Sequence, residues 1–323
     1  MFGVSVGKRF LGFALFVSIF VAVSSPPVAF GAQKETKKGT PAEIRISAWK
    51  LPFNVPVMIE LAKGSHRRAF PGMKVREVDM RTGPSLMAAL AAGEVDIVQG
   101  VGDAALLVAV SRGVDACVVA VNSRSPRAFA VVTNNPEVKL VSDLRGRKVA
   151  GLRGSVVHEV FVRALGENGV KESEVEFFPM PIPQASATLL AGKVDAALLV
   201  GSEIVRAEKA GARVIADGRG RVRGLSFVVA RREFVEKNPG LIRAFLRMRR
   251  ETLAFMRSDG EASALLAAKE TRMEPNDAAR VMGWYDFDCT VTEADRKSMA
   301  RTRRYLIDHR IIAKNVNVES LFE

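Results

Sequence analysis

Thr82-Gly83-Pro84-Ser85 is the segment whose residue types best suit a binding site. Pro84 favours the first position of a helix, where its missing N–H costs nothing. A helix start presents unpaired N–H groups and a partial positive charge, which suit a carboxylate, sulfonate or phosphate. Thr82 can add a hydroxyl group. The segment therefore predicts a contact to an anionic group, with an ordinary helix cap as the alternative.

Two aromatic residues, Trp49 and Phe53, flank the turn that follows the first predicted strand. Binding pockets are mostly apolar and aromatic, with a few polar groups that orient the ligand. We expect Trp49 and Phe53 to line such a pocket, with Asn54 as a polar neighbour. Packing into the protein core is the alternative for both rings.

A second candidate cluster lies at the start of another predicted helix and contains Arg153, Gly154, Ser155 and His158. Arg153 could form a bidentate pair with an acid, although an exposed loop arginine is the alternative. Ser155 can cap the helix, contact a ligand, or do both. His158 is also a candidate, but a hydrogen-bonded polar residue is the simpler interpretation.

The chain contains an internal repeat. Residues 84–96, from Pro84 to Asp96, are echoed 99 positions later by residues 183–195. Each copy predicts a helix that begins at proline and ends at Gly93 or Gly192. An apolar strand, 95–98 or 194–200, follows each helix. The repeat predicts two similar α/β units in one chain.

Each copy of the repeat continues into a second helix. The pairs Gly102-Asp103 and Gly201-Ser202 end the predicted strands, and all four residues are candidate ligand contacts. Asp103 and Ser202 are expected to cap the helices that follow. In parallel α/β sheets, ligands bind beyond the carboxyl ends of the strands, which is where both pairs lie.

The order of the elements predicts an α/β fold with two lobes, mostly parallel sheets flanked by helices, and a ligand cleft between the lobes. Residues 128–133 and 225–230 are expected to be the strands that cross between lobes, after a polar break at 122–127. We predict one lobe from 43–127 plus 229–323 and a second from 128–228. Helices are expected at 239–257, 262–272, 275–283 and 292–309, where they complete the first lobe. Thr292, with Asp295 three residues later, resembles a capping box at the start of the last of these helices.

The N-terminus has the pattern of a secretion signal. Lys8 and Arg9 precede the apolar run 11–23, and Ala29-Phe30-Gly31 fits a cleavage site. We expect residues 1–31 to be removed after Gly31 and 32–42 to be a disordered leader. An uncleaved membrane anchor is the alternative, although the apolar run is short for a span.

No catalytic, metal or cofactor site is expected. Ser155 and His158 lie three positions apart on one helix, which does not make a nucleophile, base and orienting group. The three histidines are scattered, and no phosphate-binding loop or dinucleotide signature follows a strand. Cys117 is expected to be a buried apolar residue, and a disulfide between Cys117 and Cys289 is left open.

The chain is basic, with a formal net charge of +13. Nucleic-acid binding is not expected, because the chain has only two Tyr and two Trp to place among the basic residues. Many basic residues fall in the predicted C-terminal helices, where a solvated surface is the simplest interpretation. They are Arg243, Arg247, Arg249, Arg250, Arg257, Arg296, Lys297, Arg301, Arg303 and Arg304.

Several motifs occur in an order that resembles a known family. They include Thr82-Gly-Pro-Ser85, Ala92-Gly-Glu-Val-Asp-Ile97, Val141-Ser-Asp-Leu-Arg-Gly-Arg-Lys-Val-Ala150, Gly154-Ser155 and Leu190-Ala-Gly-Lys-Val-Asp-Ala-Ala197. This order resembles periplasmic substrate-binding proteins of ABC importers, in the nitrate/sulfonate/bicarbonate and pyrimidine-precursor class. The resemblance implies a type II periplasmic-binding fold whose two lobes close around one ligand.

The resemblance also implies where the ligand is held. The matching segments are the turn from Trp49 to Asn54, the turn from Thr82 to Ser85, and Gly154-Ser155. Relatives often carry an aromatic-acid-proline turn after the second repeated strand, whereas this chain has Val200-Gly201-Ser202-Glu203. The identity of the ligand therefore does not follow from the resemblance.

We expect a monomeric, non-enzymatic solute receptor in the periplasm. It would capture a small anionic or aromatic organic molecule and deliver it to the membrane permease of an ABC importer. One alternative is an enzyme on the same fold that acts on a small pyrimidine or carboxylate, which the export signal disfavours. Another is a sensor partner that presents its ligand to a membrane receptor.

Overall fold

The computed structural model describes residues 41–50, 54–80, 82–313 and 316–322. The predicted signal peptide, almost all of the predicted leader, and Phe53 lie outside the described residues. No helix within the described ranges is both long and apolar enough to cross a membrane.

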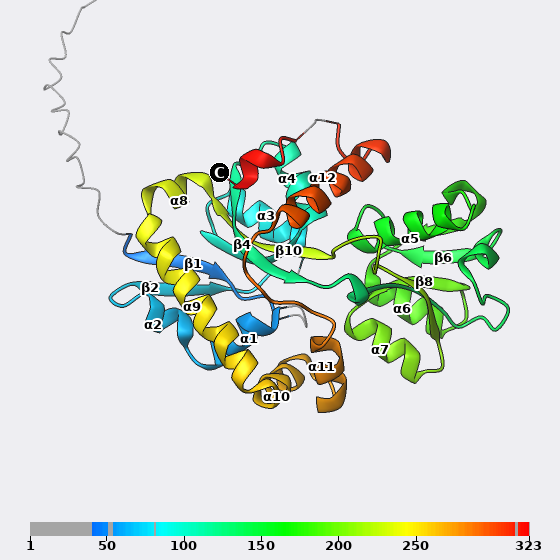
Figure 1. Ribbon diagram of the computed structural model, residues 1–323, viewed down its shortest axis with the longest axis horizontal. Coiled ribbons are helices and arrows are strands. Elements are labelled where there is room, and N and C mark those ends of the chain that lie inside the picture. Colours follow the sequence, from blue (N-terminus) through cyan, green and yellow to red (C-terminus); the bar gives the residue numbers. More distant parts are fainter. Residues whose placement is uncertain (1–40, 51–53, 81, 314–315, 323) are drawn as a thin grey trace, which may run out of the picture. The chain divides into compact units, whose positions relative to one another are not determined.

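Sheet A has five strands within the described residues, in the order β2-β1-β3-β10-β4 (Figure 1). β1 pairs in parallel with β2 and β3, whereas β10 runs antiparallel to β3 and β4. The bounds are Glu43–Ser47 for β1, Lys74–Val78 for β2, Ile97–Gly102 for β3, Ala116–Arg124 for β4 and Leu225–Arg231 for β10.

Sheet B repeats this plan. Among the described residues it has five strands, in the order β7-β6-β8-β5-β9. β6 pairs in parallel with β7 and β8, and β5 runs antiparallel to β8 and β9. The bounds are Phe129–Thr133 for β5, Lys148–Gly151 for β6, Glu176–Pro179 for β7, Ala196–Val200 for β8 and Arg213–Asp217 for β9. The predicted α/β class with mostly parallel sheets is confirmed.

The repeat in the sequence is a repeat in the structure. α3 spans Gly83–Ala91 and α6 spans Ile182–Leu190, so both ends keep the 99-residue offset. Gly93 and Gly192, which follow these helices, have φ values of 70° and 67°, in the left-handed region that favours glycine. α3 packs on β3, and α6 packs on β8.

The remaining α-helices fall into two groups, before and after β10. Those before β10 are α1 (Val55–Ala62), α2 (Ser65–Ala69), α4 (Asp103–Ser111), α5 (Val156–Glu167) and α7 (Ser202–Lys209). Those after β10 are α8 (Arg232–Lys237), α9 (Pro239–Ser258), α10 (Gly260–Thr271), α11 (Pro275–Met282) and α12 (Glu293–Asp308). α9 packs on α1 and α2, and α12 packs on α4.

The C-terminal segment also reaches the core beside sheet B. Val281, Trp284 and Tyr285 are buried with Ala197 and Leu199 of β8. α11 likewise packs on α7. The segment between α11 and α12 therefore contacts both halves of the fold, which the sequence interpretation did not anticipate.

Some local predictions are confirmed and others are wrong. The capping box at α12 is present, since Thr292 accepts the N–H of Asp295 and the Asp295 side chain accepts the N–H of Thr292. The prediction that Asp103 and Ser202 are N-caps is wrong. Gly102 and Gly201 are the N-caps, and Asp103 and Ser202 are the first residues of α4 and α7. The polar break predicted at 122–127 is wrong for residues 122–124, because β4 continues through Arg124.

The two cysteines are free. Cys117 is 3% exposed, as expected for a buried apolar residue, and Cys289 is partly buried. The disulfide that the sequence left open is therefore not formed.

Candidate functional site

The predicted binding residues lie beyond the carboxyl ends of parallel strands. Trp49 and Asn54 follow β1, Thr82 follows β2, and Gly102 ends β3 in sheet A. In sheet B, residues 153–155 follow β6 and Gly201 follows β8. Because parallel strands end at the same edge of a sheet, each sheet gathers its own candidates at one edge.

Asn54, which precedes α1, has a fully buried side chain. Its Nδ2 donates to the carbonyl of Trp49 at 2.7 Å, and its Oδ1 accepts from Asn122 Nδ2 at 3.0 Å. Trp49 itself is partly exposed. The structure therefore gives Asn54 the role of fixing the backbone beside Trp49, and a ligand contact by either residue remains a prediction.

Gly100 in β3 faces Asn54 and must be glycine. A Cβ atom at Gly100 would lie 2.2 Å from Asn54 Oδ1, far inside any normal contact distance. The φ angle of Gly100 is 86°, which side chains rarely adopt. Gly100 thus allows Asn54 to pack against the backbone of β3.

The start of α3 has the geometry that the Thr82–Ser85 pattern predicts. Thr82 is the N-cap, and its Oγ1 accepts from the N–H of Ser85 at 3.2 Å. The two hydroxyl groups lie 2.8 Å apart, and both residues are exposed. A Cβ at Gly83 would lie 3.0 Å from Cβ of Ala105, so this turn packs closely on α4. The helix cap is present, and the anion contact stays a prediction.

At the start of α4, Asp103 is buried and bonded within the protein. Its Oδ1 accepts from the N–H of Ala104 at 2.8 Å, and its Oδ2 accepts from Thr302 at 3.1 Å. Burial, and then the nearby charge of Glu159, raise the pKa of Asp103 to about 7. These contacts join α4 to α12 and leave Asp103 little freedom to bind a ligand.

Glu159 in the first turn of α5 is buried as well. Its Oε1 accepts from Arg163 at 2.6 Å, while its Oε2 has no hydrogen-bond partner within the described residues. Glu159 belongs to the helix that follows β6, and Asp103 belongs to the helix that follows β3. Two buried carboxyl groups whose charges affect each other therefore come from helices that follow strands of different sheets.

The candidates at the start of α5 are mostly engaged in internal contacts. Ser155 is the N-cap and accepts from the N–H of His158 at 3.4 Å. Arg153 donates to Glu172 at 2.6 Å, and its guanidinium lies 4.6 Å from the ring centroid of Phe177. A direct role for Arg153 in binding would require it to leave this pair.

His158 is fully buried and hydrogen-bonded at both ring nitrogens. Its Nδ1 bonds to the hydroxyl of Tyr305, and its Nε2 lies 3.2 Å from Glu172 Oε1. The hydrogen bond from His158, together with Arg153, lowers the pKa of Glu172 to about 2. This agrees with the simpler interpretation of His158 as a satisfied polar residue.

Gly201 and Ser202 begin α7 at the end of β8. The N–H of Gly201 donates to the carbonyl of Ala128 at 2.9 Å, and its φ angle is 53°. A Cβ at Gly201 would lie 3.5 Å from the hydroxyl of Tyr285. Ser202 is partly exposed. Tyr285 was not anticipated at this edge, because it comes from the C-terminal segment.

Arg249 is the first important residue that the sequence interpretation missed. The prediction of a solvated Arg249 is wrong, because its side chain is 1% exposed. It donates to Glu60 at 2.6 Å and to Asn122 at 3.0 Å, and it also bonds to Gln99. Asn122 in turn bonds to Asn54, so the network continues to the turn beside Trp49.

A sequence signal for Arg249 did exist. Phe245 and Thr252 of α9 are buried, and Arg249 lies on the same helical face. Although burial alone would raise the pKa of Glu60, the charge of Arg249 and the hydrogen bond from His66 lower it. The buried pair is therefore an ion pair with several additional hydrogen bonds.

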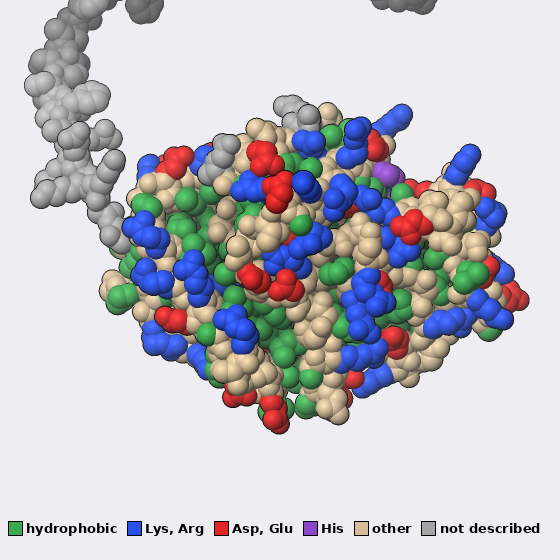
Figure 2. All heavy atoms as spheres, in the orientation of Figure 1, with side chains coloured by type: hydrophobic (Ala, Val, Ile, Leu, Met, Phe, Trp, Pro, Cys, Tyr) green, Lys and Arg blue, Asp and Glu red, His purple; other side chains and the backbone are tan. Residues whose placement is uncertain are grey.

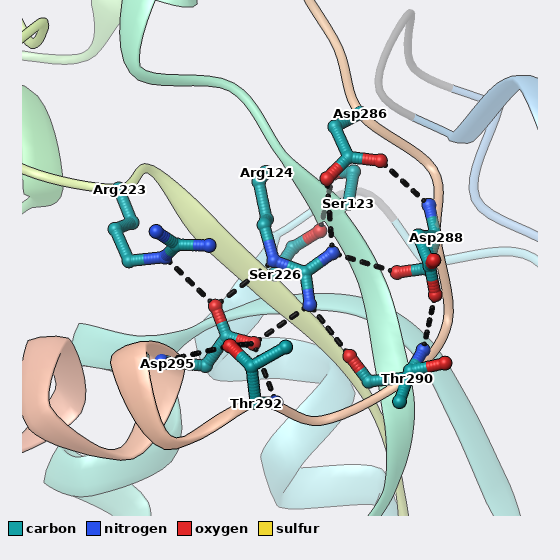
Figure 3. Close-up of polar contacts among 9 residues, drawn as sticks. All are labelled: Ser123, Arg124, Arg223, Ser226, Asp286, Asp288, Thr290, Thr292 and Asp295. Atoms are coloured by element: carbon teal, nitrogen blue, oxygen red, sulfur yellow. Dashed lines mark hydrogen bonds and ion pairs between the residues drawn. The ribbon is translucent and has the colours of Figure 1, made fainter.

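Arg124 at the end of β4 is the centre of a second polar network (Figure 3). It donates to both carboxylate oxygens of Asp295, at 2.9 and 2.6 Å, and to Asp286 at 3.1 Å. Arg223 joins through a bond to Asp295 at 2.8 Å. Burial alone would raise the pKa of Asp295, but the bonds from Arg124 and Thr292 lower it. The network ties the end of β4 and the loop before β10 to the start of α12.

The basic residues of the face drawn in Figure 2 are not gathered in one patch. Figure 2 shows Lys and Arg side chains spread over one face, with acidic and apolar side chains between them. Within the described ranges, no group of three or more His, Cys, Asp or Glu side chains could hold a metal ion.

A family model described as NMT1/THI5 like matches residues 72–263. A putative aliphatic sulfonates-binding protein of Escherichia coli (strain K12) is 32% identical over 213 residues, covering 62% of this chain and 64% of that protein. The taurine-binding periplasmic protein of the same strain is 30% identical over 168 residues, covering 51% and 52%. The chain thus aligns with between half and two thirds of these curated relatives.

Solved structures extend the similarity over nearly the whole fold. The periplasmic aliphatic sulphonate binding protein SsuA of Escherichia coli matches with a TM-score of 0.79 and 26% identity, over 88% of this chain and 98% of that one. The alkanesulfonate-binding protein of Xanthomonas axonopodis pv. citri, bound to MOPS, has the same fold, with a TM-score of 0.78 and 22% identity over 88% and 99%. The class that the motifs predicted is confirmed, and the chain belongs to the NMT1/THI5-like family.

Proposed function

We propose that this chain is an exported binding protein that captures a small organic anion, with a sulfonate as the preferred acidic group. It would deliver this ligand to the membrane permease of an ABC importer. The similarity to proteins named for binding aliphatic sulfonates and taurine supports this ligand class. These relatives are named for binding and not for a reaction, which favours a receptor over the enzyme alternative.

The observation that carries the proposal is the start of α3. Thr82 and Ser85 hold two exposed hydroxyl groups at a helix N-terminus, beyond the carboxyl end of β2. Helix N-termini attract anions through their N–H groups and their partial positive charge. Most of the other polar candidates, including Asp103 and His158, are already bonded within the protein. The acidic group is therefore proposed to sit at α3, with Trp49 packing on the body of the ligand.

The binding cleft is proposed to lie between two lobes, 43–127 plus 229–323 and 128–228. The two five-stranded sheets within the described residues support a division of this kind, with the second boundary placed before Leu225, because β10 (Leu225–Arg231) lies wholly in sheet A. The chain passes between the sheets from β4 to β5 and again from β9 to β10. Closure would be a hinge motion at these two crossings. Small-angle scattering should show a smaller radius of gyration with ligand, and an unchanged radius would contradict closure.

We further propose that the mature protein acts as a monomer in the periplasm after cleavage behind Gly31. The N-terminal basic and apolar pattern and the periplasmic relatives support export. Mass spectrometry of the secreted protein should find Ala32 as the first residue. Recovery of an intact Met1 terminus from the membrane fraction would favour the anchor alternative.

Substitutions at Thr82 test the binding site. Calorimetry with taurine and ethanesulfonate should show that Thr82→Ala loses about 0.5–1.5 kcal/mol of binding free energy, or more if the hydroxyl bonds to a charged group. Thr82→Asp should bind far more weakly, because it places a like charge beside the anion. Ser258→Asp, an exposed change at the far end of α9, is the control for added charge. Wild-type affinity in Thr82→Asp would show that the acidic group is held elsewhere.

An uptake assay separates the importer from the sensor alternative. Cells that lack this protein should take up labelled ethanesulfonate more slowly than wild-type cells, and the Thr82→Asp variant should not restore uptake. Unchanged uptake, together with tight binding by the purified protein, would favour a sensor partner.

A further inference from the structure

A cavity of about 570 Å³ lies beside the segments that connect the two sheets, and its lining includes none of the predicted cleft residues that the structure describes. Four segments form its walls: the end of β4 with the turn after it, the loop between β9 and β10, the segment after α11, and α12. We call this cavity the hinge pocket. The residues that carry the argument are Arg124, Arg221, Arg223, Trp284, Tyr285 and Arg301.

The hinge pocket has more positive charge than its own acidic groups neutralise. Its lining contains four arginines and one acidic residue, Asp286. Asp286 already accepts from Arg124, and the buried Asp295 behind the wall accepts from Arg124 and Arg223. The carboxylate of the lining and the buried one behind it are therefore already bonded within the network of Figure 3.

Three of the arginines retain guanidinium N–H groups that have no partner among the described residues. Within the described residues, Arg223 uses only its Nε, in the bond to Asp295, and Arg301 makes no hydrogen bond or ion pair. Arg221 bonds through its two Nη atoms to Asp217 and Glu167. Its buried Nε has no hydrogen-bond partner among the described residues. Guanidinium groups match the planar or trigonal oxygens of carboxylates, sulfonates and phosphates.

The lining of the pocket also includes apolar and aromatic residues. They are Trp284, Tyr285, Val222 and Pro126. The Trp284 ring has guanidinium groups of Arg127 and Arg280 near it, each 5.5 Å from the ring centroid. A volume of several hundred cubic ångströms with an apolar wall and a few charged groups is typical of sites for small organic ligands.

We propose that the hinge pocket binds a small organic oxyanion at a site separate from the cleft. Its acidic group would bond to Arg223 and Arg301, and its apolar body would contact Trp284 and Tyr285. The hydroxyl of Tyr285 lies close to Gly201, a predicted cleft residue, so Tyr285 forms part of the wall between the two sites.

The two tryptophans of the chain allow the two sites to be observed separately. Trp284 lines the hinge pocket, and Trp49 lies in the turn predicted to line the cleft. In a Trp49→Phe variant, the fluorescence of Trp284 alone is followed while benzenesulfonate is added. We expect a saturable change, and we expect no such change with the neutral analogue benzenesulfonamide. Inorganic sulfate should compete with benzenesulfonate, because the acidic group is what the arginines recognise.

Charge-removing variants identify the residues. Arg223→Gln and Arg301→Gln should each weaken benzenesulfonate binding by about tenfold or more, as expected for the loss of a charged hydrogen bond. Arg304→Gln is the matched control, because Arg304 is an exposed arginine on the same helix and does not line the pocket. Calorimetry with Trp49 intact repeats the comparison, and thermal unfolding checks that each variant is folded.

Two results would overturn the proposal. One is equal affinity of Arg301→Gln and Arg304→Gln for benzenesulfonate. The other is a fluorescence response to benzenesulfonate in the Trp284→Phe variant, which reports Trp49, together with no response in the Trp49→Phe variant, which reports Trp284. That second result would place the probe in the predicted cleft only.

Discussion

Asp96 and Asp195 make the same hydrogen bond in two different sheets. Asp96 Oδ2 accepts from the backbone N–H of Arg45 in β1 at 2.9 Å, and Asp195 Oδ2 accepts from the backbone N–H of Lys148 in β6 at 2.8 Å. In return, the N–H groups of Asp96 and Asp195 donate to the carbonyls of Arg45 and Lys148. The aspartate of the repeated motif therefore joins neighbouring strands and contributes to stability, not to ligand chemistry.

The two aspartates should differ in their effect on stability. Asp96 is 2% exposed and also binds the side chains of Arg45 and Arg231, so Asp96→Ala should lower the free energy of unfolding by about 3 kcal/mol. Asp195 is 21% exposed, and Asp195→Ala should cost about 1–2 kcal/mol. Urea unfolding measures both values. Asp115→Ala, which removes an exposed carboxylate, should change stability by less than about 0.5 kcal/mol.

Arg249 offers a stronger test of the buried network. Arg249→Met should destabilise the protein by about 3–5 kcal/mol, because it leaves the buried carboxylate of Glu60 without its cation. Arg250→Met, one position further on the exposed side of α9, should have little effect. The double variant with Glu60→Gln should recover part of the loss in urea unfolding. A loss no larger in Arg249→Met than in Arg250→Met would contradict the buried ion pair.

Asp103 should make stability depend on pH. Its pKa is about 7 in the folded protein and has an ordinary value of 3.8 in the unfolded chain. The folded state therefore binds more protons between these values, and the free energy of unfolding falls as the pH rises through this window. Asp103→Asn should remove about 1–4 kcal/mol of the difference in stability between pH 5 and pH 8.

The control for this measurement must account for His66. Burial would lower the pKa of His66, but its bonds to Glu60 and Glu77 raise it overall. That stabilisation is present at low pH and is also lost as the pH rises, so only the difference between wild type and Asp103→Asn isolates Asp103. Glu159→Gln should reduce the same slope, since the charge of Glu159 helps to raise the pKa of Asp103. Identical slopes in all three proteins would contradict the raised pKa.

Much of the fold could be predicted because its signals are local. The proline at the start and the glycine at the end of each repeated helix indicated α3 and α6, and Thr292 with Asp295 indicated the start of α12. Hydrophobic periodicity indicated the strands and the long helices. These patterns depend on residues within one or two turns of each other.

The polar networks could not be predicted in this way, because their partners are far apart in the chain. Arg124 follows a polar Asn-Ser pair and reads as part of a loop, yet its partner Asp295 lies 171 positions later and is fully buried. Arg249 reads as one basic residue among many until Glu60, 189 positions away, is placed beside it. The same limit applies to the candidate site, where internal partners occupy Arg153 and His158.

Gly100 connects the network to the predicted site and gives the last test. In Gly100→Ala, the new Cβ would collide with Asn54 Oδ1 and disturb the bond from Asn54 to the carbonyl of Trp49. We expect weaker binding of taurine and ethanesulfonate in calorimetry and a shifted Trp49 emission, recorded in a Trp284→Phe background. Gly113→Ala is the matched control, because Gly113 also has a positive φ, of 96°, but has nothing within 4 Å of its Cβ position.

Both glycine variants should lose about 1–2 kcal/mol of stability from the strained backbone, and Gly100→Ala should lose more because of the collision. Only Gly100→Ala should change Trp49 emission and ligand affinity, since Gly113 ends the turn after α4 and does not touch Asn54. Equal stability, emission and affinity in the two variants would show that Asn54 does not hold the backbone of Trp49. Loss of stability without loss of affinity would instead show that Trp49 lies outside the binding site.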